Sequence, residues 1–164
     1  MVYFKFIGKN NGNYPYRIGL NTLKYNGETF DTKPICNEGG LYFTDAKNIF
    51  EFLVYGNTLC VVSLPEDARI VKINNKWKAD KIIIEEQRDI RNVETWKFLI
   101  EENGVDIQFY NNYPLRWASK HGYLEVVKYL VESGIVIQYS DLSLKWASKN
   151  GHLEIAKFLV ENGA

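Results

Sequence analysis

The sequence lacks most features of secreted, membrane or nucleic-acid-binding chains. It has only two cysteines, Cys36 and Cys60, with no CxxC spacing, which argues against a disulfide framework and favours a reducing, intracellular compartment. No apolar run approaches the roughly 20 residues of a membrane helix, and the first residues do not resemble a signal peptide. Lys+Arg 20 balances Asp+Glu 20, so the basic excess expected of a nucleic-acid binder is missing. We therefore expect an intracellular, cytoplasmic protein that binds neither membranes nor nucleic acids.

What is present indicates a folded chain with two different halves. Hydrophobic residues make up 46% and aromatic residues 15% of the sequence, which is typical of a chain with a packed core. The first half contains short runs rich in β-branched and aromatic residues and bounded by Asn, Gly and Pro, which predict strands. These runs are YFKFIG, YPYRIGLNTL, TLCVVSLP and KADKIIIEEQ, and the segments KNNGN and YNGETF between them predict turns. We expect a small α+β domain over residues 1–88.

One helix is expected in this first domain, near residues 44–55. Thr44 is a candidate N-cap and Asp45 suits the first turn. Ile49, Phe52 and Leu53 would form the apolar stripe, and Gly56 would end the helix.

The second half repeats itself. The segment LRWASKHGYLEVVKYLVESG, residues 115–134, returns 29 residues later as LKWASKNGHLEIAKFLVENG, residues 144–163. The earlier segment NVETWKFLIEENG matches only the second part of this unit. We therefore expect residues 89–164 to hold about two and a half repeats: a half repeat over 93–104 and full repeats over 113–134 and 142–163.

Each full repeat predicts a pair of helices joined by a tight turn. Leu124, Val127, Leu130 and Val131 are spaced to lie on one face of the second helix. A shorter helix over residues 115–120 precedes it, with Gly122 and Gly151 in the turn between the two. Gly134 and Gly163 stand where a helix C-terminus needs a positive φ.

The segment YPLRWASKHGYLEVVKYLVESG resembles an ankyrin repeat, whose pattern begins T-P-L-H-x-A and continues with Gly, Leu and a Val-rich second helix. Arg116 and Lys145 replace the motif histidine, Tyr113 replaces its threonine, and the period of 29 is shorter than the usual length of about 33. The sequence of the repeat is similar to those of ankyrin arrays in giant DNA viruses of amoebae. The block from Cys36 to the KADKIII run is similar to a small domain of phage and giant-virus proteins, which supplies no activity.

The ankyrin resemblance implies an all-α solenoid that is not an enzyme and that binds a protein, of the host in the case of a viral chain, on its concave face. In a viral chain the compartment would be the host cytoplasm. Trp117 and Trp146 are either a packed ridge or interface anchors. The residues implied to bind protein are Tyr110, Asn112, Tyr113, Trp117, Lys120, His121, Tyr139, Asp141, Trp146, Lys149 and Asn150.

No motif in the sequence predicts catalysis, a cofactor or a metal. Neither Gly8/Gly12 nor Gly39/Gly40 completes a phosphate-binding loop. His121 and His152 occupy different repeat positions with no Cys or His cluster, and Ser119 and Ser148 recur because the unit recurs. One grouping is kept as a candidate small-molecule site, Asn37, Glu38 and Tyr42 beside Gly39 and Gly40. The alternative function is therefore a small-molecule-binding or enzymatic N-terminal domain delivered by the repeats.

Overall fold

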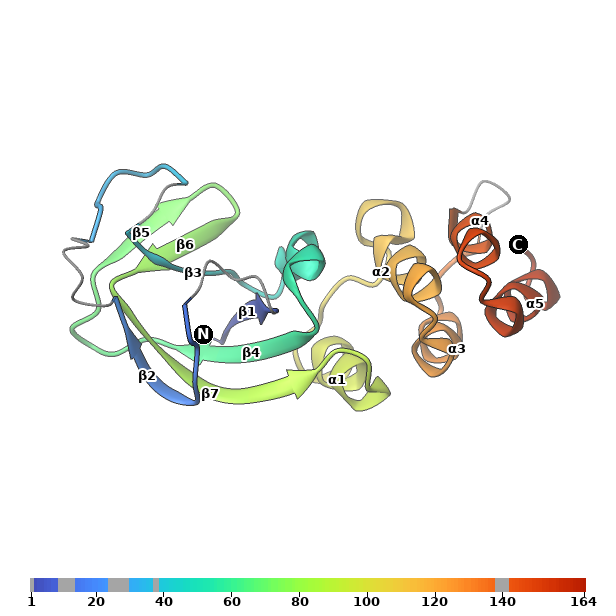
Figure 1. The fold of residues 1–164 in the computed structure, drawn as a ribbon, viewed down its shortest axis with the longest axis horizontal. Helices are drawn as coiled ribbons and strands as arrows, with labels where there is room; N and C mark the ends of the chain where they lie inside the picture. The colour runs from blue at the N-terminus through green and yellow to red at the C-terminus, as the bar shows by residue number, and fades with distance from the viewer. Residues whose placement is uncertain (1, 9–13, 24–29, 37–38, 138–141) are drawn as a thin grey trace. The chain divides into compact units, whose positions relative to one another are not determined.

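A computed structural model describes residues 2–8, 14–23, 30–36, 39–137 and 142–164 of the chain (Figure 1). The chain divides into two compact units, Met1–Asp89 and Ile90–Ala164. This division lies one residue beyond the one expected between residues 88 and 89. The predicted turn KNNGN and nearly all of YNGETF fall outside the described residues, as do Asn37 and Glu38.

The N-terminal unit is rich in β-structure. Its larger sheet has the strand order β1-β4-β7-β2, and every pair of neighbours is antiparallel. The four strands are β1 (Tyr3–Ile7), β2 (Gly19–Thr22), β4 (Thr58–Ser63) and β7 (Lys81–Asp89). A second sheet has the order β3-β6-β5, with β3 (Leu41–Phe43), β5 (Ile70–Ile73) and β6 (Lys76–Ala79).

The two sheets share a hydrophobic core. Its buried members come from the larger sheet (Cys60, Val62, Ile82, Ile84) and from the smaller one (Leu41, Phe43, Ala79). Side chains alternate between the two faces of a strand, so the odd-numbered residues of β1, Tyr3 and Ile7, pack on this core. The even-numbered Phe4 and Phe6 are also buried, so both faces of β1 are covered.

The helix expected near residues 44–55 is shorter and of another type. A 3₁₀ helix spans Ile49–Tyr55, and the prediction that Thr44 caps an α-helix is wrong. Thr44 forms an isolated antiparallel bridge with Phe4, and their backbones exchange hydrogen bonds of 2.7 and 2.8 Å. The carboxylate of Asp45 accepts hydrogen bonds from the backbone and side chain of Asn48 instead. Extended backbone therefore continues to Thr44, which delays the helix.

The predicted strands are found in part. YFKFIG and TLCVVSLP contain β1 and β4, and YPYRIGLNTL contains the short β2. KADKIIIEEQ breaks at Asp80, between β6 and β7, and therefore contributes to both sheets. The sequence patterns did not predict β3 or β5.

The C-terminal unit is helical. It begins with α1 (Val93–Lys97), which runs into a π-helical turn, η2 (Phe98–Glu102). Two helix pairs follow, α2 (Phe109–His121) with α3 (Leu124–Glu132), and α4 (Leu142–Lys149) with α5 (Leu153–Glu161). The asparagine side chain of Asn92 caps α1 by accepting a hydrogen bond from the Glu94 amide.

Contacts between the helices follow the repeat. α2 packs against α3 and α4, α4 packs against α5, and α3 packs against both α1 and α5. α2 and α4 therefore form one layer, which we call the inner helices, and α1, α3 and α5 form the other, the outer helices (Figure 1). The predicted apolar face is confirmed at its centre, since Val127 and Leu130 are fully buried.

The predicted turns and helix ends are confirmed. Gly122 and Gly151 both have positive φ between the helices of a pair. The amide of Ile135 donates to the Leu130 carbonyl beyond Gly134, and Ala164 donates to Leu159 beyond Gly163. These bonds satisfy carbonyl groups that an α-helix leaves open at its C-terminus.

Candidate functional site

The inner helix α2 starts from an unusual backbone turn. Tyr110, Asn111 and Asn112 have φ of 46°, 55° and 58°, in the left-handed region that asparagine tolerates and tyrosine rarely adopts. The right-handed helix follows from Tyr113, with Pro114 in its first turn, where proline costs no hydrogen bond. The turn leaves the Tyr110 side chain 76% exposed.

Two side chains hold this turn in place. Asn112 is buried, and its amide donates to the carbonyl of Val136 over 2.6 Å. The guanidinium of Arg116 donates to the Tyr110 carbonyl over 2.6 Å and lies near the rings of Tyr110 and Tyr113. The backbone that carries the exposed tyrosine is therefore held at the Tyr110 carbonyl and at Asn112, two residues later.

Trp117 is a packed residue. Its side chain is only 5% exposed, and its ring lies 6.2 Å from that of Trp96 and 5.3 Å from that of Tyr123, centroid to centroid. The ring of His121 covers it at 4.6 Å, and His121 Nδ1 lies 2.8 Å from the Trp117 carbonyl oxygen. Of the two roles left open for this residue, the structure supports packing.

Trp146, at the equivalent position 29 residues later, has different surroundings. It is half-buried, and the ammonium groups of Lys120 and Lys149 lie 5.1 and 5.2 Å from its ring centroid. Distances of this order allow a cation–π attraction. The Trp146 ring thus lies close to one lysine from each inner helix.

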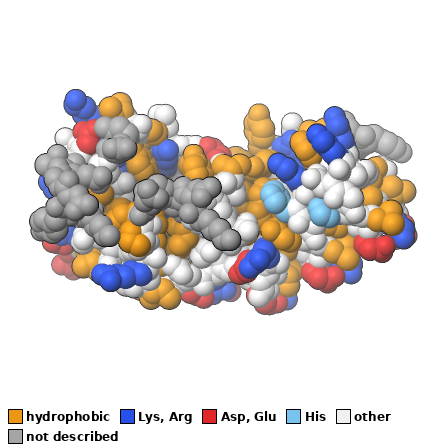
Figure 2. All heavy atoms as spheres, viewed as in Figure 1, with side chains coloured by type: hydrophobic (Ala, Val, Ile, Leu, Met, Phe, Trp, Pro, Cys, Tyr) orange, Lys and Arg blue, Asp and Glu red, His pale blue; other side chains and the backbone are white. Residues whose placement is uncertain are grey.

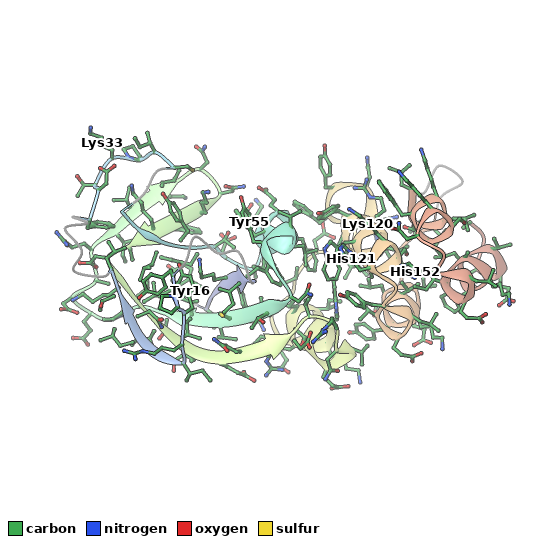
Figure 3. All side chains as sticks on the ribbon, viewed as in Figure 1. Tyr16, Lys33, Tyr55, Lys120, His121 and His152 are labelled. Atoms are coloured by element: carbon green, nitrogen blue, oxygen red, sulfur yellow. The ribbon has the colours of Figure 1, made fainter. Side chains whose placement is uncertain are left out.

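His152 joins the two full repeats. Its Nε2 lies 3.1 Å from the carbonyl oxygen of Lys120, and its ring lies against Gly122. Figure 3 shows Lys120 and His121 at the end of α2 with His152 nearby at the start of α5. His152 is therefore a packing residue between repeats, whereas His121 is exposed at the surface.

The residues predicted to bind protein fall into three groups. Asn112 and Trp117 are buried, so their side chains are not available at the surface, and we withdraw them from the candidate surface. Tyr139 and Asp141 lie outside the described residues. The others are exposed or half-buried along the inner helices and define what we call the inner surface: Tyr110, Tyr113, Lys120, His121, Trp146, Lys149 and Asn150.

The N-terminal unit contains a polar cluster around Lys5 that the sequence patterns did not predict. Lys5 Nζ donates to the carbonyl of Tyr42 over 2.9 Å and lies 4.4 Å from the ring centroid of Tyr16. Burial lowers the pKa of Lys5 to about 8. Of two smaller electrostatic effects, that of Cys60 raises this pKa and that of Lys76 lowers it further. Strand alternation could have indicated this cluster, because it places Lys5 on the same face of β1 as Tyr3 and Ile7.

Cys60 is directly opposite Lys5 in the β1–β4 register. Burial raises the pKa of this thiol to about 12, although the Lys5 charge and a hydrogen bond with Gln87 act in the other direction. A thiol of this kind stays protonated and is a poor nucleophile. Cys60 is buried in the core, whereas Cys36 is exposed.

The two glycines of the proposed small-molecule grouping have structural roles. Gly39 has a φ of 94°. The fully buried side chain of Lys78 lies against Gly40, and a β-carbon on Gly40 would be only 2.7 Å from it. Lys78 Nζ lies 3.8 Å from a carboxylate oxygen of Asp31. The close approach of Lys78 therefore accounts for Gly40 without a ligand.

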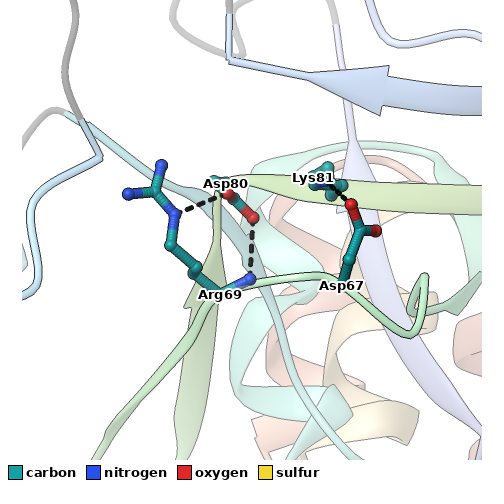
Figure 4. A network of polar contacts seen from close by, with 4 residues as sticks. All are labelled: Asp67, Arg69, Asp80 and Lys81. Carbon is teal, nitrogen blue, oxygen red and sulfur yellow. Dashed lines mark hydrogen bonds and ion pairs between the residues drawn. The ribbon is translucent and has the colours of Figure 1, made fainter.

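A surface network links the smaller sheet to β7 in the same unit. Arg69 donates to both carboxylate oxygens of Asp80, from its amide over 2.9 Å and its Nε over 2.8 Å, and Lys81 donates to Asp67 over 2.5 Å (Figure 4). Partial burial would raise the pKa of Asp80, but the Arg69 hydrogen bonds and the charges of Arg69 and Lys81 lower it overall. These contacts brace the turn at Asp80, where β6 ends and β7 begins.

Two kinds of feature are absent from the described part of the chain. No group of three or more His, Cys, Asp or Glu side chains is placed to hold a metal ion there. No helix among the described residues is long and apolar enough to cross a membrane.

Comparison with known proteins places the helical half in a family. The family described as ankyrin repeats (3 copies) matches residues 84–164. Three proteins named as ankyrin repeat proteins of Acanthamoeba polyphaga mimivirus are 39%, 35% and 36% identical to this chain over 122, 141 and 134 residues. These matches cover 69%, 82% and 79% of this chain and 38%, 68% and 40% of the respective relatives. No solved structure matches the chain.

The relatives share more than the helical half. The unit Ile90–Ala164 accounts for less than half of the chain. Matches that cover 69–82% of the chain therefore also include residues of the β-rich unit. The chain spans only about two fifths of the length of two of these relatives. The predicted repeats form helix pairs, the ankyrin family matches them, and the relatives are ankyrin repeat proteins. The chain therefore belongs to the ankyrin-repeat proteins and resembles those of a giant virus of amoebae.

Proposed function

We propose that the helical unit is a non-enzymatic protein-binding module, built as a solenoid of about two and a half helix–turn–helix repeats. Its inner surface would be the concave face that contacts a partner protein. One observation supports this most directly: exposed aromatic and basic side chains gather along the inner helices, where packing between repeats does not require them. Ankyrin repeats in general mediate protein–protein contacts, which supports the same assignment.

The individual side chains have distinct roles in this proposal. Tyr110 would be an anchor, because it is exposed and held by a left-handed turn that costs conformational energy. Trp146 would be the central aromatic contact, since large rings dominate binding energy at interfaces. Tyr139 and Asp141 stay in the proposal on the strength of the sequence.

The viral relatives support a proposal for the partner and the compartment. We propose a protein of the infected cell as the partner, and the host cytoplasm as the place of binding. The proposal includes no nucleic acid, membrane, metal or cofactor.

Site-specific photo-crosslinking on the full chain tests this function. A photo-reactive amino acid replaces Asn150 on the inner surface in one variant and the exposed Lys157 of outer helix α5 in the other. Both are incubated with an extract of Acanthamoeba cells, and adducts are identified by mass spectrometry. We expect a protein adduct from position 150 and none from position 157. Equal labelling at both positions, or no adduct at position 150, would contradict the proposal.

The alternative is that the β-rich unit binds a small molecule or acts on one. The Lys5 cluster is the observation that favours it, because a lysine with a lowered pKa is suited to reaction with carbonyl groups. Borohydride trapping with small aldehydes, followed by peptide mapping, tests this alternative. Selective labelling of Lys5, lost in Lys5→Met, would support it.

A further inference from the structure

Charge is segregated between the two layers of the helical unit. The inner helices α2 and α4 contain Arg116, Lys120, Lys145 and Lys149 and no acidic residue. The outer layer, with its π-helical turn, carries most of the acidic residues of the unit: Glu94, Glu101, Glu102, Glu125, Glu132, Glu154 and Glu161. On the face seen in Figure 2, basic side chains gather over α2 and α4 and acidic ones lie along the edge of α3 and α5. The neutral chain thus has a basic face.

The four inner cations form a regular array. Arg116 and Lys120 are four residues apart on α2, and Lys145 and Lys149 stand at the equivalent positions of α4. Residues four apart share one side of a helix, with β-carbons roughly 6 Å apart. The axes of packed helices lie about 8–10 Å apart. The array therefore offers two rows of positive charge at the spacing of side chains on an extended peptide.

These cations lack the partners that their counterparts on the outer helices have. Lys97, Lys128 and Lys157 each pair with a glutamate three residues earlier, at 2.8, 2.9 and 3.2 Å. Within the described ranges no ion pair joins Arg116, Lys120, Lys145 or Lys149 to a carboxylate, and the buried Nε of Arg116 has no hydrogen-bond partner. Asp141 lies outside those ranges.

Arg116 helps to hold the Tyr110 turn, but the concentration of four positive charges is unfavourable for the inner helices themselves. Like charges four residues apart destabilise a helix, and two of the four charges, those of Lys120 and Lys149, lie near the same ring, that of Trp146. What the array provides is a set of charges that an anion could neutralise, and three of them, on Arg116, Lys120 and Lys149, already lie beside aromatic rings.

We propose that the inner surface, together with the neighbouring Arg116 and Lys145, binds an extended acidic segment of a partner protein. Its carboxylates would lie on the four inner cations and an apolar or aromatic side chain on Trp146. This inference rests on the proposed protein-binding function and adds the chemistry of the partner. A protein segment is favoured over nucleic acid because the acidic outer layer repels a long polyanion, and the sequence pI is about 6.7 rather than strongly basic.

Fluorescence anisotropy on the full chain tests the inference. The probe is a labelled 12-residue peptide with glutamate at every second or third position around a central tyrosine. The comparison probe has each glutamate replaced by glutamine. The test variant is Lys120→Gln with Lys149→Gln, and the matched control is Lys128→Gln with Lys157→Gln on the outer helices. Both variants lose two positive charges.

We expect the acidic probe to bind at least about tenfold more tightly than the neutral one, with affinity falling as salt is raised. The inner double variant should lose about tenfold or more in affinity, and the outer one less than about twofold. Equal binding of both probes, or equal loss in both variants, would overturn the inference. So would a single-stranded RNA oligonucleotide that displaces the acidic probe and binds more tightly.

A phage-displayed random peptide library separates this inference from the function on which it rests. Enrichment of acidic peptides whose binding is lost in Lys120→Gln with Lys149→Gln supports it. Enrichment of neutral peptides whose binding is lost in Trp146→Ala would overturn the acidic partner and leave protein binding intact. Absence of any inner-surface binder in the library, together with no crosslink at position 150, would overturn both.

Discussion

The imidazole of His152 lies directly against the backbone of Gly122, one repeat earlier. A β-carbon on Gly122 would stand 2.7 Å from the Cε1 atom of His152, closer than real β-carbons approach a neighbour. Gly122 also has a φ of 80°, so two independent requirements keep a side chain out of this turn. Gly151, the equivalent glycine of the next repeat, has a φ of 75°, but a β-carbon placed there would meet nothing within 4 Å.

Gly122→Ala should therefore destabilise the helical unit more than Gly151→Ala. Both changes carry the cost of alanine at positive φ, about 1 kcal/mol or more. Only Gly122→Ala also forces the His152 ring away from its contact with the Lys120 carbonyl oxygen, at a cost of about 1 kcal/mol further. Urea denaturation followed by circular dichroism measures both free energies of unfolding. Equal losses in the two variants would show that the His152 contact does not constrain the turn.

Leu130→Ala should cost about 2–5 kcal/mol, because Leu130 is fully buried in α3 and the deletion leaves a cavity. The matched control is Leu153→Ala in α5, where the leucine is 62% exposed and truncation should change stability by about 0.5 kcal/mol or less. Denaturant titration of both variants gives the comparison. A loss below about 0.5 kcal/mol for Leu130→Ala would contradict its place in the core.

The helical half could be predicted from the sequence because its signals are local and occur twice. The apolar spacing around Leu130 sets the buried face, and the glycines at 122, 134, 151 and 163 set the turns and helix ends. The left-handed turn at Tyr110 could not be predicted in this way. It depends on a hydrogen bond between Asn112 and Val136, 24 residues apart in the sequence.

The β-rich half was predicted less well because its pairing is non-local. β3 has three residues and no alternation long enough to recognise, and its partner is β6. Threonine is a common helix cap, yet the backbone of Thr44 pairs with that of Phe4, forty residues earlier. The candidate residues of the inner surface were found through the repeats. The burial of Trp117 and the partial exposure of Trp146 required the structure, since the two residues are equivalent in sequence.

The two cysteines should react with thiol reagents at very different rates. Cys36 is exposed, whereas Cys60 is fully buried and burial raises its pKa to about 12. Alkylation with iodoacetamide at pH 8 should modify Cys36 rapidly and Cys60 only after unfolding, because the thiolate is the reactive form. Mass spectrometry of the native and urea-treated protein counts the labels at each site. Two labels on the native protein within minutes would contradict the burial of Cys60.

Asp80→Asn should destabilise the β-rich unit by about 1–2 kcal/mol at neutral pH, since a neutral amide loses the charge that Arg69 and Lys81 favour. Asp67→Asn is the matched control, and it should cost less because the Asp67 side chain is 77% exposed.

The Asp80 effect should depend on pH with a defined sign. The pKa of Asp80 is lower in the folded protein than in the unfolded chain, where an aspartate titrates near 4. The folded state therefore binds fewer protons than the unfolded state between these two pKa values, and its stability falls as pH falls through that window. The advantage of the wild-type chain over Asp80→Asn should be constant above about pH 5 and shrink below about pH 4. Denaturation series at pH 7, 5, 4 and 3 measure it. A difference between the two chains that stays unchanged down to pH 3 would show that the Asp80 charge is not what stabilises this turn.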